Sequence, residues 1–267
     1  MQSHENNAQI ILSLDVGGSF IKSALIRNGE IIREREKVPS CSGGSAGEIA
    51  AALRRAAVEK VDAIAVAIPG PFDYHRGVSL MEHKFAAVKG MDLKKFLPDV
   101  PVKFIHDANA FLLGEWNGES RMGAITLGTG IGAAVIVNGE LLVNDLGSPA
   151  PKASLWNKPF CGMTVEEALD LRNHGPGQPP EKWHRFGELL AEILTPWSEQ
   201  FQLEKIVIGG QIANDFELFK EPLQKLPVDR SKLGEKAALL GTARQFFKET
   251  PCASFIGKKR KRACLGY

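Results

Sequence analysis

The chain has 267 residues, of which 44% are hydrophobic and 24% charged, and its formal net charge is +2 at pH 7. This composition is that of an ordinary soluble globular protein, with room for one large domain or two modest ones. The small net charge argues against DNA or RNA as the main partner, and no apolar run approaches the roughly 18–20 residues of a membrane span. The basic run Lys258–Arg262 is a local exception, and such a run is more often a solvated tail than a surface that binds nucleic acid or membrane.

The four cysteines are scattered, at positions 41, 161, 252 and 264, and form no C-x-x-C pair. This spacing argues against a zinc knuckle and a disulfide framework, and it is typical of a reducing compartment. The opening residues, MQSHENNAQ, contain no apolar signal core, so we do not expect export. The sequence therefore predicts a cytoplasmic protein without membrane association.

The first half of the chain opens with a predicted meander of three strands. Runs of strand formers at Ile10–Leu14 and Phe20–Ile26 precede Asn28-Gly29, which predicts a hairpin into a third strand over Glu30–Val38. Near-continuous apolar strands are typical of a sheet that helices cover on both faces. The later predictions are a loop at 40–47, a helix at 46–60, buried strands at 61–68 and 102–105, and a helix at 108–116.

The segment Met122–Val143 repeats this opening meander at a constant offset of 110 residues. At that offset Gly18 meets Gly128, Ser19 meets Thr129, and the Asn-Gly-Glu turn at 28–30 meets the one at 138–140. Two unrelated hairpins would explain the shared Asn-Gly but not the shared glycine–hydroxyl turns, so we interpret the chain as two similar half-domains. The second half continues with predicted helices at 164–172, 183–201, 215–226 and 232–248, and a buried strand at 205–208.

Three glycine-bearing turns each follow a predicted strand: Gly17-Gly18-Ser19, GTGIG at Gly128–Gly132, and Gly209-Gly210. Glycine allows a ligand to approach the backbone closely, and consecutive N–H groups form a concave site for anions such as polyphosphate. Each turn alone is more often a plain turn, and GTGIG is neither a full G-x-G-x-x-G nor a P-loop. Their matched places in two α/β halves favour a nucleotide held in a cleft between the halves.

Two acidic residues stand at predicted strand ends. Asp15 precedes the first glycine turn, where a carboxylate can hold the water shell of a metal ion while N–H groups hold phosphate. Asp107 ends its strand at the predicted N-cap of the next helix, and capping alone would explain an aspartate there. However, ligands of α/β folds bind at this edge of the sheet, and a carboxylate there can accept a hydroxyl proton during phosphoryl transfer.

Ordered motifs make the chain resemble the ROK-family sugar kinases from about Ile10 to Phe247. The resemblance implies the actin-like (ribonuclease H-like) fold, with α/β domains at 1–112 and 113–267 and an interdomain cleft that binds ATP and sugar. The last helix, at 232–248, would cross back to the first domain, and a homodimer is also suggested. The motifs are LDVGGSFIK, PGPFD, HDANAFLLGE, TLGTGIGAAVIVNG, IVIGGQI and AALLGTARQFF.

By this resemblance the chain transfers phosphate from ATP, with Mg²⁺, to a hexose or hexose derivative, as glucokinase does. Asp107 would be the base that activates the sugar hydroxyl, and Asp15 would hold Mg²⁺ through water. The sugar side would consist of Gly70, His83, His106, Asn109 and Glu115. The nucleotide side would consist of Asp15, Gly17, Gly18, Ser19, Lys22, Gly128, Thr129, Gly130, Gly209 and Gly210, of which Gly209-Gly210 would line the adenosine pocket.

The chain departs from the family pattern at several positions. His106 replaces the usual asparagine, and the E-x-G-H segment is absent, with no histidine and no glutamate before Glu166 in the region 146–172. The cysteine-rich zinc motif is missing, and Cys161 alone cannot supply four ligands, so we expect no zinc. The loop at 80–93 replaces an asparagine–tryptophan segment, and it is either a solvated loop or a sugar contact through His83 or Lys84.

Two rival functions belong to other classes. A repressor of this family carries a DNA-binding module before the kinase-like part, and the first predicted strand already starts at Ile10, so we expect no such module. A non-catalytic sensor of sugar or nucleotide is the alternative, because the sugar-contacting glutamate is missing. The presence of both Asp15 and Asp107 argues against a sensor. The sequence does not identify the sugar, and N-acetylmannosamine, allose and fructose all remain open.

Overall fold

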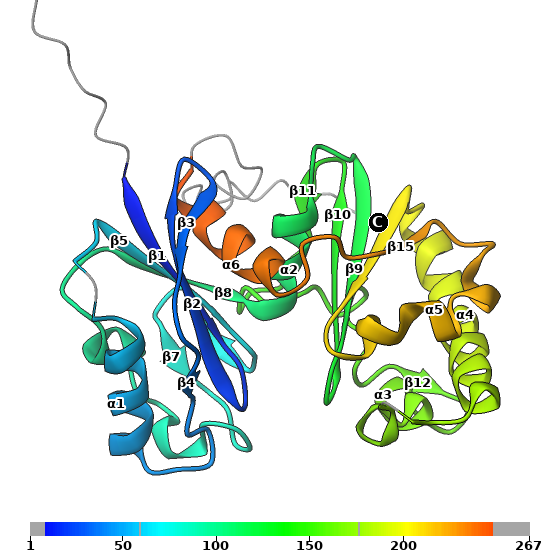
Figure 1. Ribbon diagram of the computed structural model, residues 1–267, viewed down its shortest axis with the longest axis horizontal. Coiled ribbons are helices and arrows are strands. Elements are labelled where there is room, and N and C mark those ends of the chain that lie inside the picture. The colour runs from blue at the N-terminus through cyan, green and yellow to red at the C-terminus, as the bar shows by residue number, and fades with distance from the viewer. Residues whose placement is uncertain (1–8, 59, 176, 248–267) are drawn as a thin grey trace, which may run out of the picture.

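The structure is a computed structural model that describes residues 9–58, 60–175 and 177–247. The basic run 258–262, Cys252 and Cys264 therefore lie outside the described residues. Two α/β halves stand side by side, each built on its own sheet, blue in the first half and green to yellow in the second (Figure 1). In the described ranges, no helix combines the length and the apolar character that crossing a membrane requires.

The first sheet has the strand order β3-β2-β1-β5-β8. Strand β1 runs antiparallel to β2 and parallel to β5, so the predicted meander leads into a parallel sheet. Helix α1 (Ala46–Ala56) begins at a capping box between Ser45 and Glu48 and buries Ile49 and Leu53 against this sheet. The strands are β1 (Ile10–Val16), β2 (Phe20–Arg27), β3 (Glu30–Glu34), β5 (Ala63–Ile68) and β8 (Val102–His106), and β4 (Val38–Pro39) pairs with β2.

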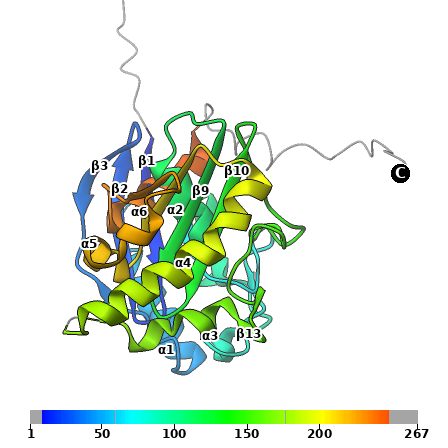
Figure 2. The same cartoon turned by 90° about the vertical axis from the view of Figure 1, so that its right-hand side faces the viewer.

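The second sheet repeats this topology with the order β11-β10-β9-β14-β15, which agrees with the half-domain repeat read from the sequence. Helix α4 (Pro180–Phe201) crosses its outer face (Figure 2) and buries Trp183 and Trp197 completely or nearly so. Two shorter helices, α3 (Val165–Leu169) and α5 (Phe216–Phe219), complete that layer. The strands are β9 (Arg121–Leu127), β10 (Ile131–Val137), β11 (Glu140–Leu141), β14 (Lys205–Gly209) and β15 (Val228–Arg230).

Helices α2 (Asp107–Glu115) and α6 (Glu235–Ala243) lie between the two sheets (Figure 1). They approach so closely that a Cβ on Gly114 would lie 1.9 Å from the Ala237 carbonyl oxygen, and one on Gly241 would lie 1.8 Å from that of Ala110. Helix α2 packs against strands of both sheets, whereas α6 packs mainly on β1 and β5. This crossing of two helices is the joint between the halves, and it requires glycine on both sides.

The observed elements differ from the predicted ones in two regions. The helix predicted over 215–226 is wrong, because the chain forms α5 between 3₁₀ turns at Ile212–Asp215 and Glu221–Leu223, and Pro222 interrupts any longer helix. The helix predicted from Lys232 begins only at Glu235, after Gly234 with φ 53°. The remaining short elements are β6 (Phe72–Asp73), β7 (Val78–Ser79), β12 (Pro159–Phe160), β13 (Met163–Thr164) and 3₁₀ turns at Ala86–Val88, Leu93–Phe96, Leu171–Asn173 and Arg244–Phe246.

Candidate active site

The first glycine turn joins β1 to β2, and neighbouring serines hold its carbonyl groups. The Ser40 and Ser42 hydroxyls both donate to the Gly18 carbonyl, at 2.8 and 2.5 Å, and the Ser40 N–H donates to the Ser19 carbonyl at 2.9 Å. In the described part of the chain, the N–H groups of Gly18 and Ser19 donate to no acceptor. Adjacent free amides form an anion site. The sequence did not reveal the two serines, whose run SCSGGS predicted only a loop.

The second glycine turn joins β9 to β10 and also leaves two consecutive amides free, one residue further along than in the first turn. The Gly128 N–H closes the turn on the Gly130 carbonyl at 3.1 Å, as the Gly17 N–H closes the first turn on the Phe20 carbonyl at 3.0 Å. Among the described residues, the N–H groups of Thr129 and Gly130 find no acceptor. The structure therefore supplies two separate pairs of amides that can each hold phosphate oxygens.

A carboxylate that the sequence did not reveal lies against this second turn. The oxygens of Glu166 would lie 3.3 and 3.4 Å from a Cβ built on Gly130. Glu166 stands in the first turn of α3, whose start is fixed by a capping box between Thr164 and Glu167. That T-x-x-E pattern is readable in the sequence and predicts where α3 begins, but not that the helix returns to the glycine turn.

The third pair of glycines is explained by close packing. A Cβ on Gly209 would lie 2.3 Å from the Phe111 ring, and one on Gly210 would lie 2.3 Å from the Leu127 carbonyl oxygen. Gly210 also has φ 89°, which side chains rarely adopt. The end of β14 thus needs both glycines to pass α2 and β9, and their contact with adenosine stays a prediction.

Asp15 lies on β1 just before the first turn, with only 16% of its side chain exposed. Lys22 bridges it to α6, because the lysine Nζ lies 3.5 Å from the Asp15 carboxylate and 3.3 Å from that of Glu235. Burial raises the pKa of Asp15, Lys22 opposes the shift, and the negative charge of Asp107 adds to it. Asp15 and Asp107 therefore lie within electrostatic reach of each other.

This pair of carboxylates suits Mg²⁺ better than zinc. Mg²⁺ keeps several waters and is usually bound by one or two carboxylates together with substrate phosphates. Asp15 and Asp107 beside a phosphate turn provide that donor set. A structural zinc site needs four ligands, and the described residues contain no group of three or more histidine, cysteine, aspartate or glutamate side chains that could hold a metal. Cys161 is free and exposed.

Asp107 is the first residue of α2 rather than its N-cap, which corrects the sequence prediction. The N-cap is His106, whose Nδ1 accepts from the Ala108 N–H at 3.2 Å. The Asp107 Oδ1 accepts from the same N–H at 2.7 Å, and 42% of the Asp107 side chain remains exposed. The positive end of the helix dipole stabilises an ionised carboxylate there. Asp107 is thus oriented at one oxygen and open at the other.

His106 and Tyr74 line the wall beside Asp107. Burial lowers the pKa of His106, although the Asp107 charge opposes this, and the His106 Nδ1 lies 3.1 Å from the Asp107 Oδ1. The Tyr74 hydroxyl donates to the Ile68 carbonyl at 3.1 Å, and burial raises its pKa well above the ordinary value, with a further contribution from Asp107. A Cβ on Gly70 would lie 3.4 Å from the Tyr74 hydroxyl and 3.8 Å from the His106 Nε2, so Gly70 keeps this wall open.

Asn109 is fully buried two residues further along α2. Its Nδ2 donates to the Gly147 carbonyl at 3.1 Å, and its Oδ1 has no partner among the described residues. Buried polar atoms are nearly always hydrogen-bonded, so an unpaired acceptor beside the site indicates a missing donor, such as a ligand hydroxyl. Gly147 in turn lies against the Tyr74 ring, which brings a loop of the second half onto the first half.

Two residues predicted for the sugar side lie elsewhere or have no contact there. Glu115 ends α2 about 12 Å along the helix axis from Asp107, and its carboxylate accepts from the Ser231 hydroxyl and the Leu233 N–H. Glu115 therefore anchors the segment before α6, and a contact of Glu115 with sugar stays a prediction that these hydrogen bonds do not support. His83 is exposed and has no hydrogen-bond partner in the described part of the chain.

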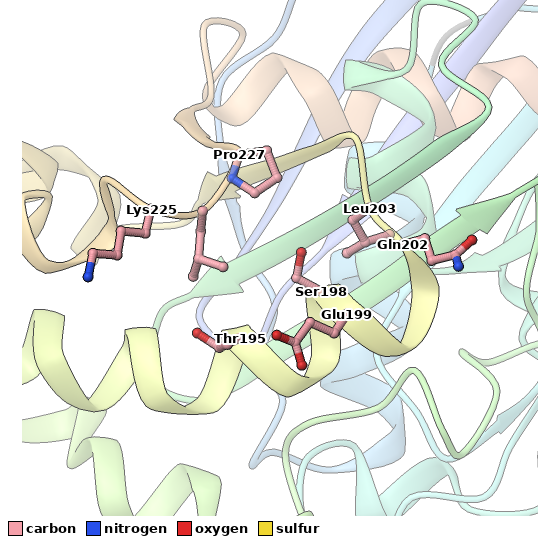
Figure 3. Close-up of a pocket in the computed structure, with 8 residues that line it drawn as sticks. Thr195, Ser198, Glu199, Gln202, Leu203, Lys225 and Pro227 are labelled. Atoms are coloured by element: carbon pink, nitrogen blue, oxygen red, sulfur yellow. The ribbon is translucent and has the colours of Figure 1, made fainter.

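A hollow of about 470 Å³ is separate from this cluster. It lies between the C-terminal end of α4 and the segment before β15, and no residue predicted for nucleotide or sugar lines it (Figure 3). Free amides and the carboxylates of Asp15 and Asp107 lie instead at the glycine turns and at the start of α2. The lining residues are Thr195, Ser198, Glu199, Gln202, Leu203, Lys225, Leu226 and Pro227.

Known proteins resemble the chain in sequence and in fold. N-acetylmannosamine kinase of Yersinia pseudotuberculosis is 24% identical over 243 residues, which cover 75% of this chain and 82% of that protein. The inorganic polyphosphate/ATP-glucomannokinase from Arthrobacter sp. strain KM superposes with a TM-score of 0.71 at 23% identity, over 89% of this chain and 98% of the other. A ROK family glucokinase from Streptomyces griseus, solved with glucose and AMPPNP, superposes with a TM-score of 0.70 at 19% identity, over 88% and 98%.

These superpositions confirm the actin-like α/β fold with two related domains. The model of the ROK family matches residues 11–148, a stretch that contains the first two glycine turns, His106 and Asp107. The match covers more than half of the chain and agrees with the ordered motifs, so the protein belongs to the ROK family.

Proposed function

We propose that this protein is an ATP-dependent kinase of a hexose or hexose derivative. The observation that carries the proposal is that two turns with free amides both lie near the half-exposed carboxylate of Asp107. The charge of Asp107 acts on Asp15, just before the first turn, and a Cβ on Gly132, just after the second, would lie 3.3 Å from the Ala108 Cβ. Similar proteins are named N-acetylmannosamine kinase, glucomannokinase and glucokinase, which supports a sugar as the acceptor. The cleft would lie between domains at 1–112 and 113–267.

On the nucleotide side, the free N–H groups of Gly18 and Ser19 would bind one end of the triphosphate, and those of Thr129 and Gly130 the other. Mg²⁺ held through water by Asp15 would neutralise charge on the transferring phosphoryl group. Lys22 would keep the Asp15 carboxylate oriented toward the turn. Gly209-Gly210, at the end of β14, would line the adenosine pocket.

On the sugar side, the unpaired Asn109 Oδ1 would accept from a sugar hydroxyl. The protonated Nε2 of His106 would donate to another hydroxyl, where the usual family asparagine could both donate and accept. Glu166 would accept from a third hydroxyl, because a carboxylate beside a phosphate turn is repelled by phosphate unless a donor or cation lies between them. These groups give the site one fixed acceptor, one donor and one charged acceptor.

In the reaction, the Asp107 carboxylate accepts the proton of the sugar's primary hydroxyl as its oxygen bonds to the γ-phosphorus. The bond from that phosphorus to the bridging oxygen breaks, and ADP leaves with the electron pair. Transfer of this kind relies on positioning and on charge stabilisation rather than on covalent chemistry of the protein. The helix N-terminus at Asp107 orients the base.

The test is a coupled assay of ADP release with Mg²⁺-ATP over a panel of sugars that includes N-acetylmannosamine, glucose, mannose, allose and fructose. We expect sugar-dependent ADP release with at least one of them. The 6-deoxy analogue of the active sugar should bind without release, because it lacks the primary hydroxyl. Sugar or nucleotide binding without any release would instead indicate the non-catalytic sensor.

Two properties outside the site remain predictions. A homodimer is suggested by the family, and sedimentation of the full chain over a range of concentrations tests it. A cytoplasmic location is suggested by the scattered cysteines, of which Cys41 and Cys161 are free in the structure.

A further inference from the structure

Lys84 lies directly across the first phosphate turn. Its Cδ and Cε would each lie 3.3 Å, and its Nζ 3.5 Å, from a Cβ built on Gly18. The side chain therefore places its ammonium at the turn whose amides are free, rather than at the wall formed by Tyr74 and His106. The sequence predicted that the loop at 80–93 is either solvated or in contact with the sugar. It did not predict that Lys84 lies beside the first glycine turn.

The backbone next to Lys84 is held in an uncommon conformation. Phe85 is 1% exposed and has φ 58°, a left-handed conformation that bulky residues rarely adopt. The surrounding structure maintains it, because the Phe85 N–H donates to the Ser42 carbonyl at 2.7 Å. Ser42 is the residue whose hydroxyl donates to the Gly18 carbonyl. The turn, its serine support and the Lys84 backbone are thus one connected unit.

The charge of Lys84 is not neutralised by the protein. No carboxylate of the described residues lies within ion-pair distance of it, although its neighbour Glu82 pairs with Lys89 at 2.5 Å. The nearby carboxylate of Asp15 is already occupied by Lys22. An exposed ammonium beside two free amides is complementary to a phosphate group, because charge-assisted hydrogen bonds to phosphate are about twice as strong as neutral ones.

We infer that Lys84 binds the terminal phosphoryl group of the nucleotide and stabilises it during transfer, an inference that rests on the proposed kinase function. The sugar oxygen bonds to the γ-phosphorus, the bond to the bridging oxygen breaks, and the proton goes to Asp107. Lys84 stays protonated throughout and exchanges no proton. Its positive charge stabilises the phosphoryl oxygens and the negative charge that develops on the leaving ADP.

The experiment compares Lys84→Met and Lys84→Arg with wild type. Lys60→Met is the matched control. Lys60 is an exposed lysine between α1 and β5, where β5 begins, whereas the first glycine turn follows the other end of the neighbouring strand β1. Calorimetry with Mg²⁺ and AMPPNP, and separately with AMP, measures nucleotide binding without sugar. Coupled ADP release then measures kcat and the KM values for ATP and for the sugar.

We expect Lys84→Met to weaken AMPPNP binding by about 10-fold or more and to leave AMP binding unchanged. The kcat should fall by at least about 10-fold with the sugar KM unchanged, and Lys84→Arg should recover part of the loss. Unchanged AMPPNP affinity and kcat in Lys84→Met, or an increase in the sugar KM alone, would overturn the inference.

The two proposals fail in different ways. If wild type phosphorylates a sugar and Lys84→Met does so equally well, the role of Lys84 is wrong and the kinase function stands. If wild type phosphorylates no sugar but prefers AMPPNP to AMP, and Lys84→Met loses that preference, the phosphate contact stands and the kinase function is wrong. If wild type binds neither nucleotide, both are wrong.

Discussion

The two glycine turns have similar backbones, but the charged side chains around them differ. Each joins the first two strands of a sheet with the same strand order, and each leaves two consecutive N–H groups free. Around the first turn lie Asp15, Lys22 and Lys84, whereas the second has the carboxylate of Glu166. At the position that corresponds to Asp15, the second half has the fully buried Ile125. The repeat thus preserves the anion-binding backbone and changes the side chains that act on it.

Phosphate binding by the backbone and the chemistry of the side chains are therefore distributed differently between the two halves. Backbone amides can hold phosphate in either half, because they depend only on the turn. In the proposed function, metal coordination and cation contacts belong to the first turn, and a hydroxyl acceptor belongs to the second. Asp107 stands between them, at the start of a helix that packs on both sheets. The four predictions that follow test this division, in order of decreasing effect.

The largest effect is expected for Asp107→Asn. The amide cannot accept the hydroxyl proton, so kcat should fall by about 10³-fold or more while nucleotide binding and the thermal midpoint are retained. Coupled ADP release and thermal unfolding measure both. The control is Asp99→Asn, an exposed aspartate in the segment before β8, which should leave both unchanged. Near-normal turnover by Asp107→Asn would exclude it as the base.

The next effect is expected for Gly241→Ala, which acts on the joint that brings the two turns together. The added Cβ would lie 1.8 Å from the Ala110 carbonyl oxygen and 2.5 Å from the Gly114 nitrogen, so α2 and α6 must separate. The free energy of unfolding should fall by about 3 kcal/mol, and the thermal midpoint by roughly 6–12 °C. Gly43→Ala, where the space is open, should change stability by less than about 0.5 kcal/mol. Equal midpoints for the two variants would contradict the close packing.

A smaller and selective effect is expected for Glu166→Gln at the second turn. Loss of a charged acceptor should raise the sugar KM by roughly 10- to 100-fold, with the KM for ATP unchanged or lower. Steady-state kinetics with each substrate varied in turn measures the difference. The exposed Glu140→Gln, on β11, is the control and should have no effect. A rise in the KM for ATP alone would move Glu166 to the nucleotide side.

The smallest effect is on stability, for Asp15→Asn. Because burial raises the pKa of Asp15 in the folded state above the ordinary 3.8, the ionised carboxylate destabilises the ligand-free fold at neutral pH. The variant should therefore unfold at higher urea concentration than wild type at pH 7. As the pH falls through the raised pKa, wild-type Asp15 binds its proton, and the advantage disappears below about 3.8. A variant less stable at pH 7 would show that the ion pair with Lys22 outweighs the cost of burial.

Much of the fold could be predicted because its signals are local. Apolar runs gave the strands, Asn-Gly gave the hairpins, and the offset between Gly18 and Gly128 gave the repeat that the strand orders match. The ends of elements were less accurate, as at the helix predicted over 215–226, because Pro222 and the neighbouring packing decide where helices stop. The family could be predicted from the order of the motifs along the chain, which is a property of the sequence alone.

The sequence by itself determined the glycine turns and the carboxylates of Asp15 and Asp107, because each belongs to a short motif of neighbouring residues. It also determined the duplicated plan of the chain, because the same motif recurs in the second half. Only the tertiary structure decided that Lys84 lies on the first turn, that Glu166 lies on the second, and that Glu115 binds the Ser231 hydroxyl before α6. Those placements join residues far apart in the chain. Their positions depend on how loops and helices pack across a sheet, and no local pattern of residues carries that information.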